Sequence, residues 1–196
     1  MTIIEKVKSY CTNILEGNIC KKLPYHNLLH TKRVVDSAKK IIQYLQIPDE
    51  DAEIIIISAW FHDIGFCETY YGHEDESIRL ANQYLKDLGY ETDKIALVLS
   101  CIEATKIPQN PKNILGEILC DSDLHHLGST NYFSYNRLLR TEWSNECDKS
   151  FTDLEWYRLN KDFLENHKYF TQYGQQELKK VKLLNIEKLK LLFQDL

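Results

Sequence analysis

Histidine and aspartate side chains stand out from an otherwise apolar framework, at spacings that could build a metal centre. His26 and His30 are four residues apart, so a helix would project both from one face. His62-Asp63 ends a wholly apolar run, where an aspartate is costly unless it is paired or binds a metal. Imidazole and carboxylate together suit zinc, iron, manganese, nickel or cobalt, and the residue types do not choose among these metals.

A later acidic pair, Asp121 and Asp123, could complete the set of ligands. A lone buried histidine is more often a hydrogen-bonded core residue than a ligand, and an aspartate near a helix end is more often a cap. No single residue therefore indicates a site. The interpretation depends on the order and spacing of the whole set.

This ordered set, H…HD…D, resembles the signature of the HD superfamily of metal-dependent phosphohydrolases. Segment 24–30, PYHNLLH, is similar to the metal-site segment of cyclic-nucleotide phosphodiesterases, and segment 60–65, WFHDIG, shows the HD dipeptide in its usual setting. Further segments resemble a bacterial group of predicted HD phosphohydrolases of poorly defined substrate, namely Asp121-Ser122-Asp123-Leu124, Leu127-Gly128, Tyr132, Tyr135 and Arg140-Thr141-Glu142-Trp143. The resemblance spans most of the chain.

The resemblance implies a set of metal ligands. These are His30, His62, Asp63 and Asp123, with Asp121 as the alternative fourth ligand. The expected cofactor is a divalent transition metal (Mn, Fe, Zn, Ni or Co) or Mg. Additional histidines often accompany two metals in this superfamily, and segment 103–106 has none. One ion and two ions are therefore both open.

The resemblance also implies catalytic roles. His26 occupies the position that protonates the leaving oxygen in the related phosphodiesterases, and Asp63 belongs to the catalytic set as well as to the ligands. His73-Glu74 with Ser77 resembles the H-E-x-x-S motif of HD triphosphohydrolases, where the histidine lies at the active site. His73 is thus a second acid/base candidate or a ligand for a second metal. The alternative is that Glu74 caps a helix and His73 lies in solvent.

Two basic residues are candidates for binding a substrate phosphate, Lys106 and Arg140. An arginine in a long amphipathic helix is more often solvated or salt-bridged, so this assignment depends on tertiary context.

The resemblance implies metal-assisted hydrolysis of a phosphomonoester or phosphodiester in a small molecule, with a nucleotide as the expected substrate. Two alternatives stay open. One is a catalytically degenerate HD module that binds a nucleotide as a sensor or assembly partner, and the other is a di-iron HD oxygenase. The oligomeric state is open, with a homodimer as one option.

Helices are the elements that must position these residues. Only 7 glycines and 4 prolines interrupt the chain, which is too few for an all-β fold. Apolar residues recur at helical spacing in nine segments: 3–15, 26–45, 50–63, 74–88, 92–106, 115–127, 131–147, 153–170 and 175–193. We therefore predict an all-α fold, a single HD-type domain over 1–196 with eight to nine helices. The run Ile54–Phe61 could form a buried strand, but its length and its helical neighbours favour a central helix.

Composition restricts the class of protein. The 196 residues carry a net charge of −5 without a basic run, which argues against binding of extended nucleic acid. No signal peptide and no membrane-length apolar segment is visible, so we expect a cytoplasmic protein with no membrane partner. The 6 cysteines contain no C-x-x-C pair, and free buried thiols are the expectation.

Overall fold

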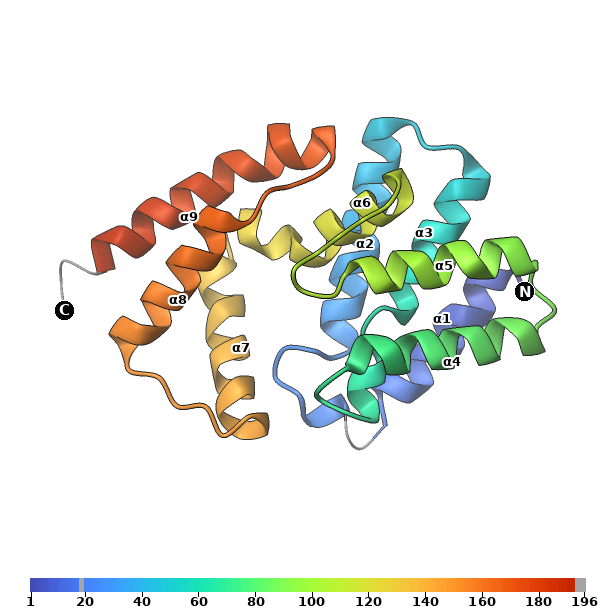
Figure 1. Cartoon of the computed structure of the whole chain (residues 1–196), viewed down its shortest axis with the longest axis horizontal. Helices are drawn as coiled ribbons and strands as arrows, with labels where there is room; N and C mark the ends of the chain where they lie inside the picture. Colours follow the sequence, from blue (N-terminus) through green and yellow to red (C-terminus); the bar gives the residue numbers. More distant parts are fainter. Residues whose placement is uncertain (18–19, 193–196) are drawn as a thin grey trace. The chain divides into compact units, whose positions relative to one another are not determined.

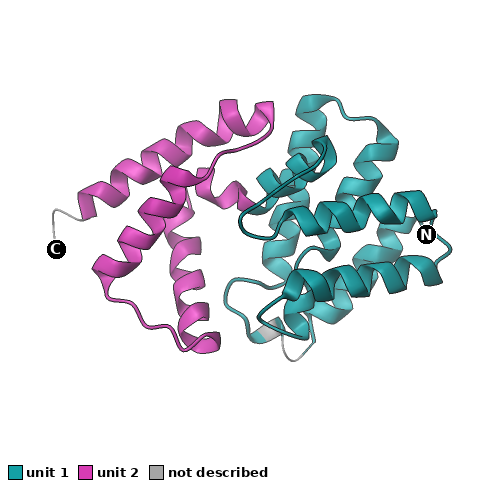
Figure 2. Cartoon of the chain, viewed as in Figure 1, with its two compact units in different colours: residues 1–123 teal, residues 124–196 magenta. Residues whose placement is uncertain are grey.

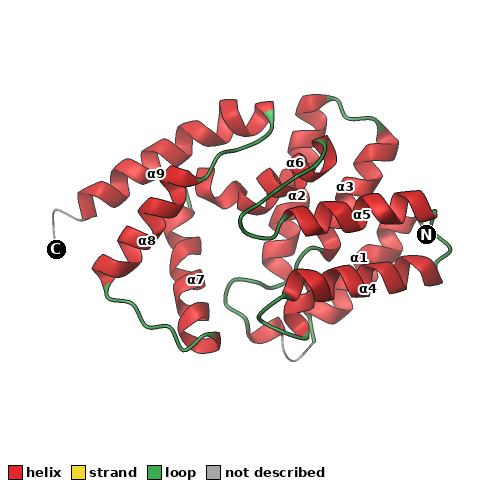
Figure 3. Cartoon of the chain, in the orientation of Figure 1, coloured by secondary structure: helices red, strands yellow, loops and turns green. Residues whose placement is uncertain are grey.

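The computed structural model describes residues 1–17 and 20–192. Within these ranges every regular element is helical and no β-strand occurs (Figure 3). The α-helices are α1 (Ile3–Leu15), α2 (Leu28–Leu45), α3 (Asp49–Phe61), α4 (His73–Asp87), α5 (Thr92–Ala104), α6 (Ile114–Asp123), α7 (Tyr132–Glu146), α8 (Asp153–Asn166) and α9 (Lys179–Leu192) (Figure 1). The predicted all-α fold is confirmed.

The chain packs as two compact units, residues 1–123 and 124–196 (Figure 2). Unit 1 contains α1 to α6, and unit 2 contains α7 to α9. The assignment of 1–196 to one domain remains a prediction. All four predicted metal ligands belong to unit 1.

Helix α3 is the centre of unit 1. Its residues Ile54 to Phe61 are all buried, and the helix packs against α1, α2, α4, α5 and α6. A helix that is apolar on every side requires such surroundings, because no face of it favours water. The prediction of a central helix rather than a strand is therefore confirmed.

The start of α2 differs from the prediction. The helix begins at Leu28, and the side chain of Asn27 accepts hydrogen bonds from the backbone N–H groups of Leu29 and His30. This cap satisfies amide groups that have no partner within the helix and fixes its first turn. His26 consequently precedes the helix, and the predicted common helical face for His26 and His30 was wrong.

Several other predicted boundaries also shift. The predicted helix 115–127 divides into α6 and a 3₁₀ helix, η3 (Leu124–Gly128). Helix α8 ends at Asn166 rather than at residue 170. The predicted last helix opens with a π-helical turn, η4 (Gly174–Leu178), and its predicted end at residue 193 lies outside the described residues.

Unit 2 has its own core. The buried apolar cluster consists of Leu124, Leu127, Tyr132, Leu164, Tyr169, Ile186 and Leu189. Gly128 allows η3 to approach η4 closely, because a Cβ atom at this position would lie 2.5 Å from the carbonyl oxygen of Leu178. Only glycine fits where another backbone comes this close.

The expectation of free thiols is wrong for one pair of cysteines. Cys20 and Cys67 form a disulfide, with their Cα atoms 5.0 Å apart, and they are separated by 47 residues in the sequence. Cys11, Cys101 and Cys120 are free and buried, as expected, and Cys147 is free and half-buried. A pairing over this distance has no local sequence signal, since it depends on how α1 and α3 pack.

None of the helices in the described part of the chain combines the length and the apolar character that crossing a membrane requires.

Candidate metal centre

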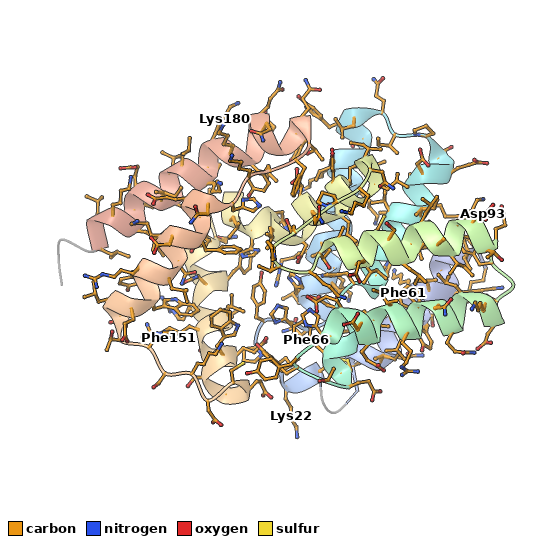
Figure 4. The ribbon with its side chains drawn as sticks, viewed as in Figure 1. Lys22, Phe61, Phe66, Asp93, Phe151 and Lys180 are labelled. Atoms are coloured by element: carbon orange, nitrogen blue, oxygen red, sulfur yellow. A yellow bond between two sulfur atoms is a disulfide. The ribbon has the colours of Figure 1, made fainter. Side chains whose placement is uncertain are left out.

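Three helices of unit 1 bring the predicted ligands together. His30 lies in the first turn of α2, and Asp123 is the last residue of α6. His62 and Asp63 directly follow α3, whose last residue, Phe61, is labelled in Figure 4. Helix α3 packs against both α2 and α6, so the three positions meet although residues 30 and 123 are far apart in the sequence.

The ligand atoms form a tight group. The Nε2 atoms of His30 and His62 are 3.3 Å apart, and Asp63 Oδ2 lies 3.2 and 3.1 Å from them. Asp123 Oδ1 lies 3.3 Å from His30 Nε2 and 3.6 Å from His62 Nε2. Ligands at zinc-like bond lengths around a tetrahedral ion are separated by about 3.3 to 3.6 Å. These five distances therefore suit ligands of a common cation, and all four ligand atoms lie within 4.8 Å of one another.

The hydrogen bonding of the group also fits a cation. Asp63 Oδ2 is buried and accepts no hydrogen bond from the described residues. His62 Nδ1 donates to the carbonyl oxygen of Ala59 at 2.9 Å, since a carbonyl can only accept. Nδ1 therefore carries the proton of the neutral ring, and the lone pair of Nε2 faces the group. A cation bound at Nε2 would leave the hydrogen bond to Ala59 unchanged.

Charge in this buried group favours positive ions. Burial lowers the pKa of His62, but the carboxylates of Asp63 and Asp123 outweigh burial and raise this pKa well above its usual value. Burial alone would raise the pKa of both carboxyls, yet the imidazoles of His30 and His62 lower the pKa of each below its ordinary range. The imidazoles and carboxylates thus favour one another's charged forms, and a cation among them would face the same two carboxylates.

The structure distinguishes between the two candidates for the fourth ligand. Among the described residues, the group of side chains that could hold a metal consists of His30, His62, Asp63 and Asp123. Asp121 is completely buried and is not part of this group. The geometry therefore favours Asp123, and metal binding by these residues remains a prediction.

His73 also lies beside the group. Its Nε2 atom is 3.6 Å from Asp63 Oδ1 and 3.5 Å from Glu74 Oε1. Burial lowers the pKa of His73, although the two carboxylates oppose this shift. His73 is partly buried at the first position of α4, so the alternative in which it lies in solvent is not what the structure shows.

His26 approaches the group from the segment before α2. Its ring centroid lies 5.6 Å from that of His30 and 6.3 Å from that of His73. The two predicted acid/base residues thus lie on neighbouring segments of unit 1, next to the candidate ligands.

Ser77, in the H-E-x-x-S motif, has a positional role. Its hydroxyl accepts a hydrogen bond from Gly65 N–H at 2.9 Å. A Cβ atom at Gly65 would lie 1.9 Å from the carbonyl oxygen of His73, so glycine is required for this contact. The pair joins the segment after Asp63 to the start of α4.

The two predicted phosphate-binding residues are both paired with carboxylates. Lys106 Nζ lies 2.6 Å from Asp75 Oδ1 and 2.8 Å from Glu103 Oε2. Arg140 belongs to unit 2, where its guanidinium lies 2.7 Å from Asp153 Oδ1. Both assignments to phosphate binding remain predictions.

Sequence reasoning missed two partners of the candidate site. One is the Ala59 carbonyl, and no side-chain pattern marks a backbone acceptor. The other is Phe66, whose ring packs against both His26 and His73. An aromatic residue three positions after Asp63 is a weak signal, because most aromatic residues near an apolar helix are core residues.

Comparison with known proteins identifies the family. The family model described as HD domain matches residues 27–128, which is just over half of the chain. The crystal structure of a predicted HD superfamily hydrolase from an uncultured Thermotogales bacterium has the same fold, with a TM-score of 0.66 at 16% identity over 97% of this chain and 91% of that chain. No curated protein matches the chain. The matched residues include the entire His-Asp group, and the chain belongs to the HD domain family.

Proposed function

We propose that the chain is a metal-dependent phosphohydrolase that cleaves a phosphomonoester or phosphodiester in a small molecule, with a nucleotide as the expected substrate. The observation that carries this proposal is the buried group of two imidazoles and two carboxylates, in which Asp63 Oδ2 accepts no hydrogen bond from the described residues. The nearest groups to this oxygen are the two imidazole Nε2 atoms at 3.1 and 3.2 Å, and a cation bound to all three atoms would satisfy them together.

The proposed site holds one divalent ion on His30, His62, Asp63 and Asp123. When bound, such an ion supplies a water-derived nucleophile at neutral pH and neutralises charge on the phosphoryl oxygens. The residue types do not select the metal among Mn, Fe, Zn, Ni, Co and Mg. His62 would be oriented by its hydrogen bond to Ala59, a partner of the kind that fixes ligating histidines in metal centres.

We assign proton transfer to His26 and His73. His26 would donate a proton to the leaving oxygen, as the resemblance to phosphodiesterases implies. General-acid assistance of this type contributes typically about 10² to 10⁴-fold in rate. Lys106 would have to exchange its contacts with Asp75 and Glu103 for a substrate phosphate, so its role would be limited to binding.

Metal analysis followed by an activity panel tests the proposal. The full chain is purified, its metal content is measured, and it is assayed with Mn²⁺, Mg²⁺, Co²⁺ and Ni²⁺ on p-nitrophenyl phosphate, bis(p-nitrophenyl) phosphate and common nucleotides. We expect His62→Ala and Asp123→Asn to lose bound metal and turnover together. Asp93→Asn, which alters an exposed aspartate in α5, is the matched control and should keep both.

Other outcomes would favour the alternatives. A His62→Ala variant with full metal and full turnover would overturn the proposed site. Tight nucleotide binding without hydrolysis, at a site that takes up no metal at neutral pH, would support the sensor module. Bound iron with an oxygen-dependent change in optical absorption would support the di-iron oxygenase.

A further inference from the structure

Phe66 lies between the two histidines that are candidates for acid/base chemistry. Its ring centroid is 4.2 Å from that of His26 and 3.6 Å from that of His73, with interplanar angles of 17° and 18°. The two imidazoles are 6.3 Å apart, farther than either is from Phe66. The three rings therefore form a stack with Phe66 in the middle, which we call the ring stack.

The position of Phe66 is fixed by its neighbours in the chain. It belongs to a 3₁₀ helix, η2 (Ile64–Cys67), and its N–H donates to the carbonyl oxygen of Asp63. On one side Gly65 contacts the backbone of His73, and on the other Cys67 is bonded to Cys20, in the segment that leads to His26. Phe66 is thus held beside the segments that carry both histidines.

The outer contacts of the ring stack are also aromatic. Tyr70 lies edge-on to Phe66 with centroids 5.2 Å apart, and Tyr25 lies edge-on to His26 at 4.8 Å. Phe66 itself is only 5% exposed. A buried ring with neighbours on both faces and at its edge has little freedom to move.

The stack is important because His73 makes no close polar contact with the carboxylates nearest to it. Its distances of 3.6 Å to Asp63 and 3.5 Å to Glu74 are longer than usual hydrogen bonds. The imidazole of His73 lies nearly parallel to the ring of Phe66, with an interplanar angle of 18° and centroids 3.6 Å apart. A proton donor or acceptor must keep a fixed orientation towards the reacting atoms to be effective.

We propose that Phe66 is a positioning residue that holds the imidazoles of His26 and His73 in the orientation needed for proton transfer. The catalytic consequence rests on the proposed function, whereas the ring stack can be tested without any substrate. Phe66 acts through the two histidines.

The test compares three variants of the full chain. Phe66→Met keeps apolar volume but removes the ring, and Phe66→Tyr keeps the ring. Phe61→Met makes the same chemical change at a buried phenylalanine of unit 1 that packs against Tyr10 and Tyr84 instead of the histidines (Figure 4). Phe61 therefore serves as the matched control for the loss of a buried ring.

The first measurement is NMR spectroscopy of the histidine rings, of which the chain has 7. Signals of His26 and His73, assigned with His26→Gln and His73→Gln, should be displaced by the ring current of Phe66. The displacement should vanish in Phe66→Met and persist in Phe66→Tyr and Phe61→Met. Unchanged signals in a folded Phe66→Met protein would overturn the ring stack.

The second measurement is turnover, with Mn²⁺, of the nucleotide that the wild type hydrolyses best, because its alkoxide leaving group needs a proton whereas p-nitrophenolate does not. We expect kcat of Phe66→Met to fall about 10²-fold with little change in KM or metal content, while Phe66→Tyr stays close to wild type. In the His26→Gln, His73→Gln background the same change should have little further effect, because Phe66 acts through these rings. A full additional loss in that background, or unchanged kcat in the wild-type background, would overturn the positioning role.

The two measurements separate this proposal from the proposed function. If the wild-type chain hydrolyses none of the substrates, the proposed function fails, and the catalytic role of Phe66 fails with it. The NMR measurement still decides whether the ring stack exists. If the wild type is active and Phe66→Met is equally active, only the role of Phe66 is overturned. If Phe66→Met does not fold, Phe66→Leu replaces it in both measurements.

Discussion

Two groups of buried polar side chains, one in each unit, differ in how far their members satisfy one another. In unit 2, four side chains satisfy one another: Trp156 Nε1 donates to Asn136 at 2.6 Å, Asn136 donates to Tyr132 at 3.3 Å, and Tyr132 donates to Asn160 at 3.2 Å. Asn160 completes the set by donating to the Trp156 carbonyl at 2.7 Å. In unit 1, the His-Asp group leaves Asp63 Oδ2 and His30 Nδ1 buried without hydrogen bonds from the described residues.

The difference between these groups is chemical. The unit 2 network is neutral and complete, so it favours one packing of α7 and α8 and needs no ligand. The unit 1 group is charged and incomplete, and its atoms are those that bind metals. A buried polar group that is already satisfied stabilises the fold, whereas one that is unsatisfied and has ligand-type atoms indicates a site.

The largest expected effect separates function from stability in unit 1. Asp63→Asn keeps the shape of the side chain but removes the charge, so turnover should fall by about 10³-fold or more with loss of bound metal. The free energy of unfolding of the same variant is measured in chelator, so that loss of metal is separated from the loss of the contact between Asp63 and His62. Activity assays, metal analysis and urea denaturation provide the three values. A stable variant with wild-type turnover contradicts the assignment.

Metal should stabilise the fold only through unit 1. At a free Mn²⁺ concentration 100 times Kd, the free energy of unfolding should rise by about 2.7 kcal/mol, because only the folded chain offers the complete group. Asp123→Asn should show no such rise, and Asp93→Asn should match the wild type. An equal stabilisation of Asp123→Asn would mean that the metal binds elsewhere. Thermal or urea unfolding with and without metal makes the comparison.

Breaking the unit 2 network should have the converse effect. Asn136→Ala leaves Trp156 Nε1 without its acceptor, and the free energy of unfolding should fall by about 2 kcal/mol while metal content stays the same. Asn166→Ala, which removes an exposed amide of α8, should change stability by less than about 0.5 kcal/mol. If Asn136→Ala lost metal instead of stability, the contrast between the units would fail.

The smallest effect concerns a buried titratable group of unit 1 that stays neutral. Burial raises the pKa of Cys101 to about 12, whereas an unfolded thiol titrates near about 8.5. Above the unfolded pKa the unfolded state loses a proton that the folded state keeps, so stability falls as pH rises. Between neutral pH and pH 9.5, the free energy of unfolding of the wild type should fall by about 1.4 kcal/mol more than that of Cys101→Ala. If the free energy of unfolding of both proteins depended on pH in the same way, the raised pKa of Cys101 would be contradicted.

Local patterns in the sequence were sufficient for the helices of unit 1 and for most of the candidate site. The run Ile54 to Phe61 is apolar on every side, and only a central helix can bury all of it. His30, His62 and Asp63 stand out as polar residues at the edges of apolar helices, so their types and order already indicated a metal site. Helix ends were less predictable, since they depend on caps such as Asn27 and on contacts with other elements.

Tertiary structure decided the rest. Asp121 and Asp123 are two positions apart, about 200° around a helix, so the face of α6 that packs against α2 and α3 determines which aspartate joins the group. The disulfide between Cys20 and Cys67 and the stacking of Phe66 on two histidines likewise join residues that are distant in the chain. Residue types and periodicity are local properties and can be read from the sequence alone. Which side chains finally meet depends on the packing of helices against each other, and that packing is a property of the whole unit.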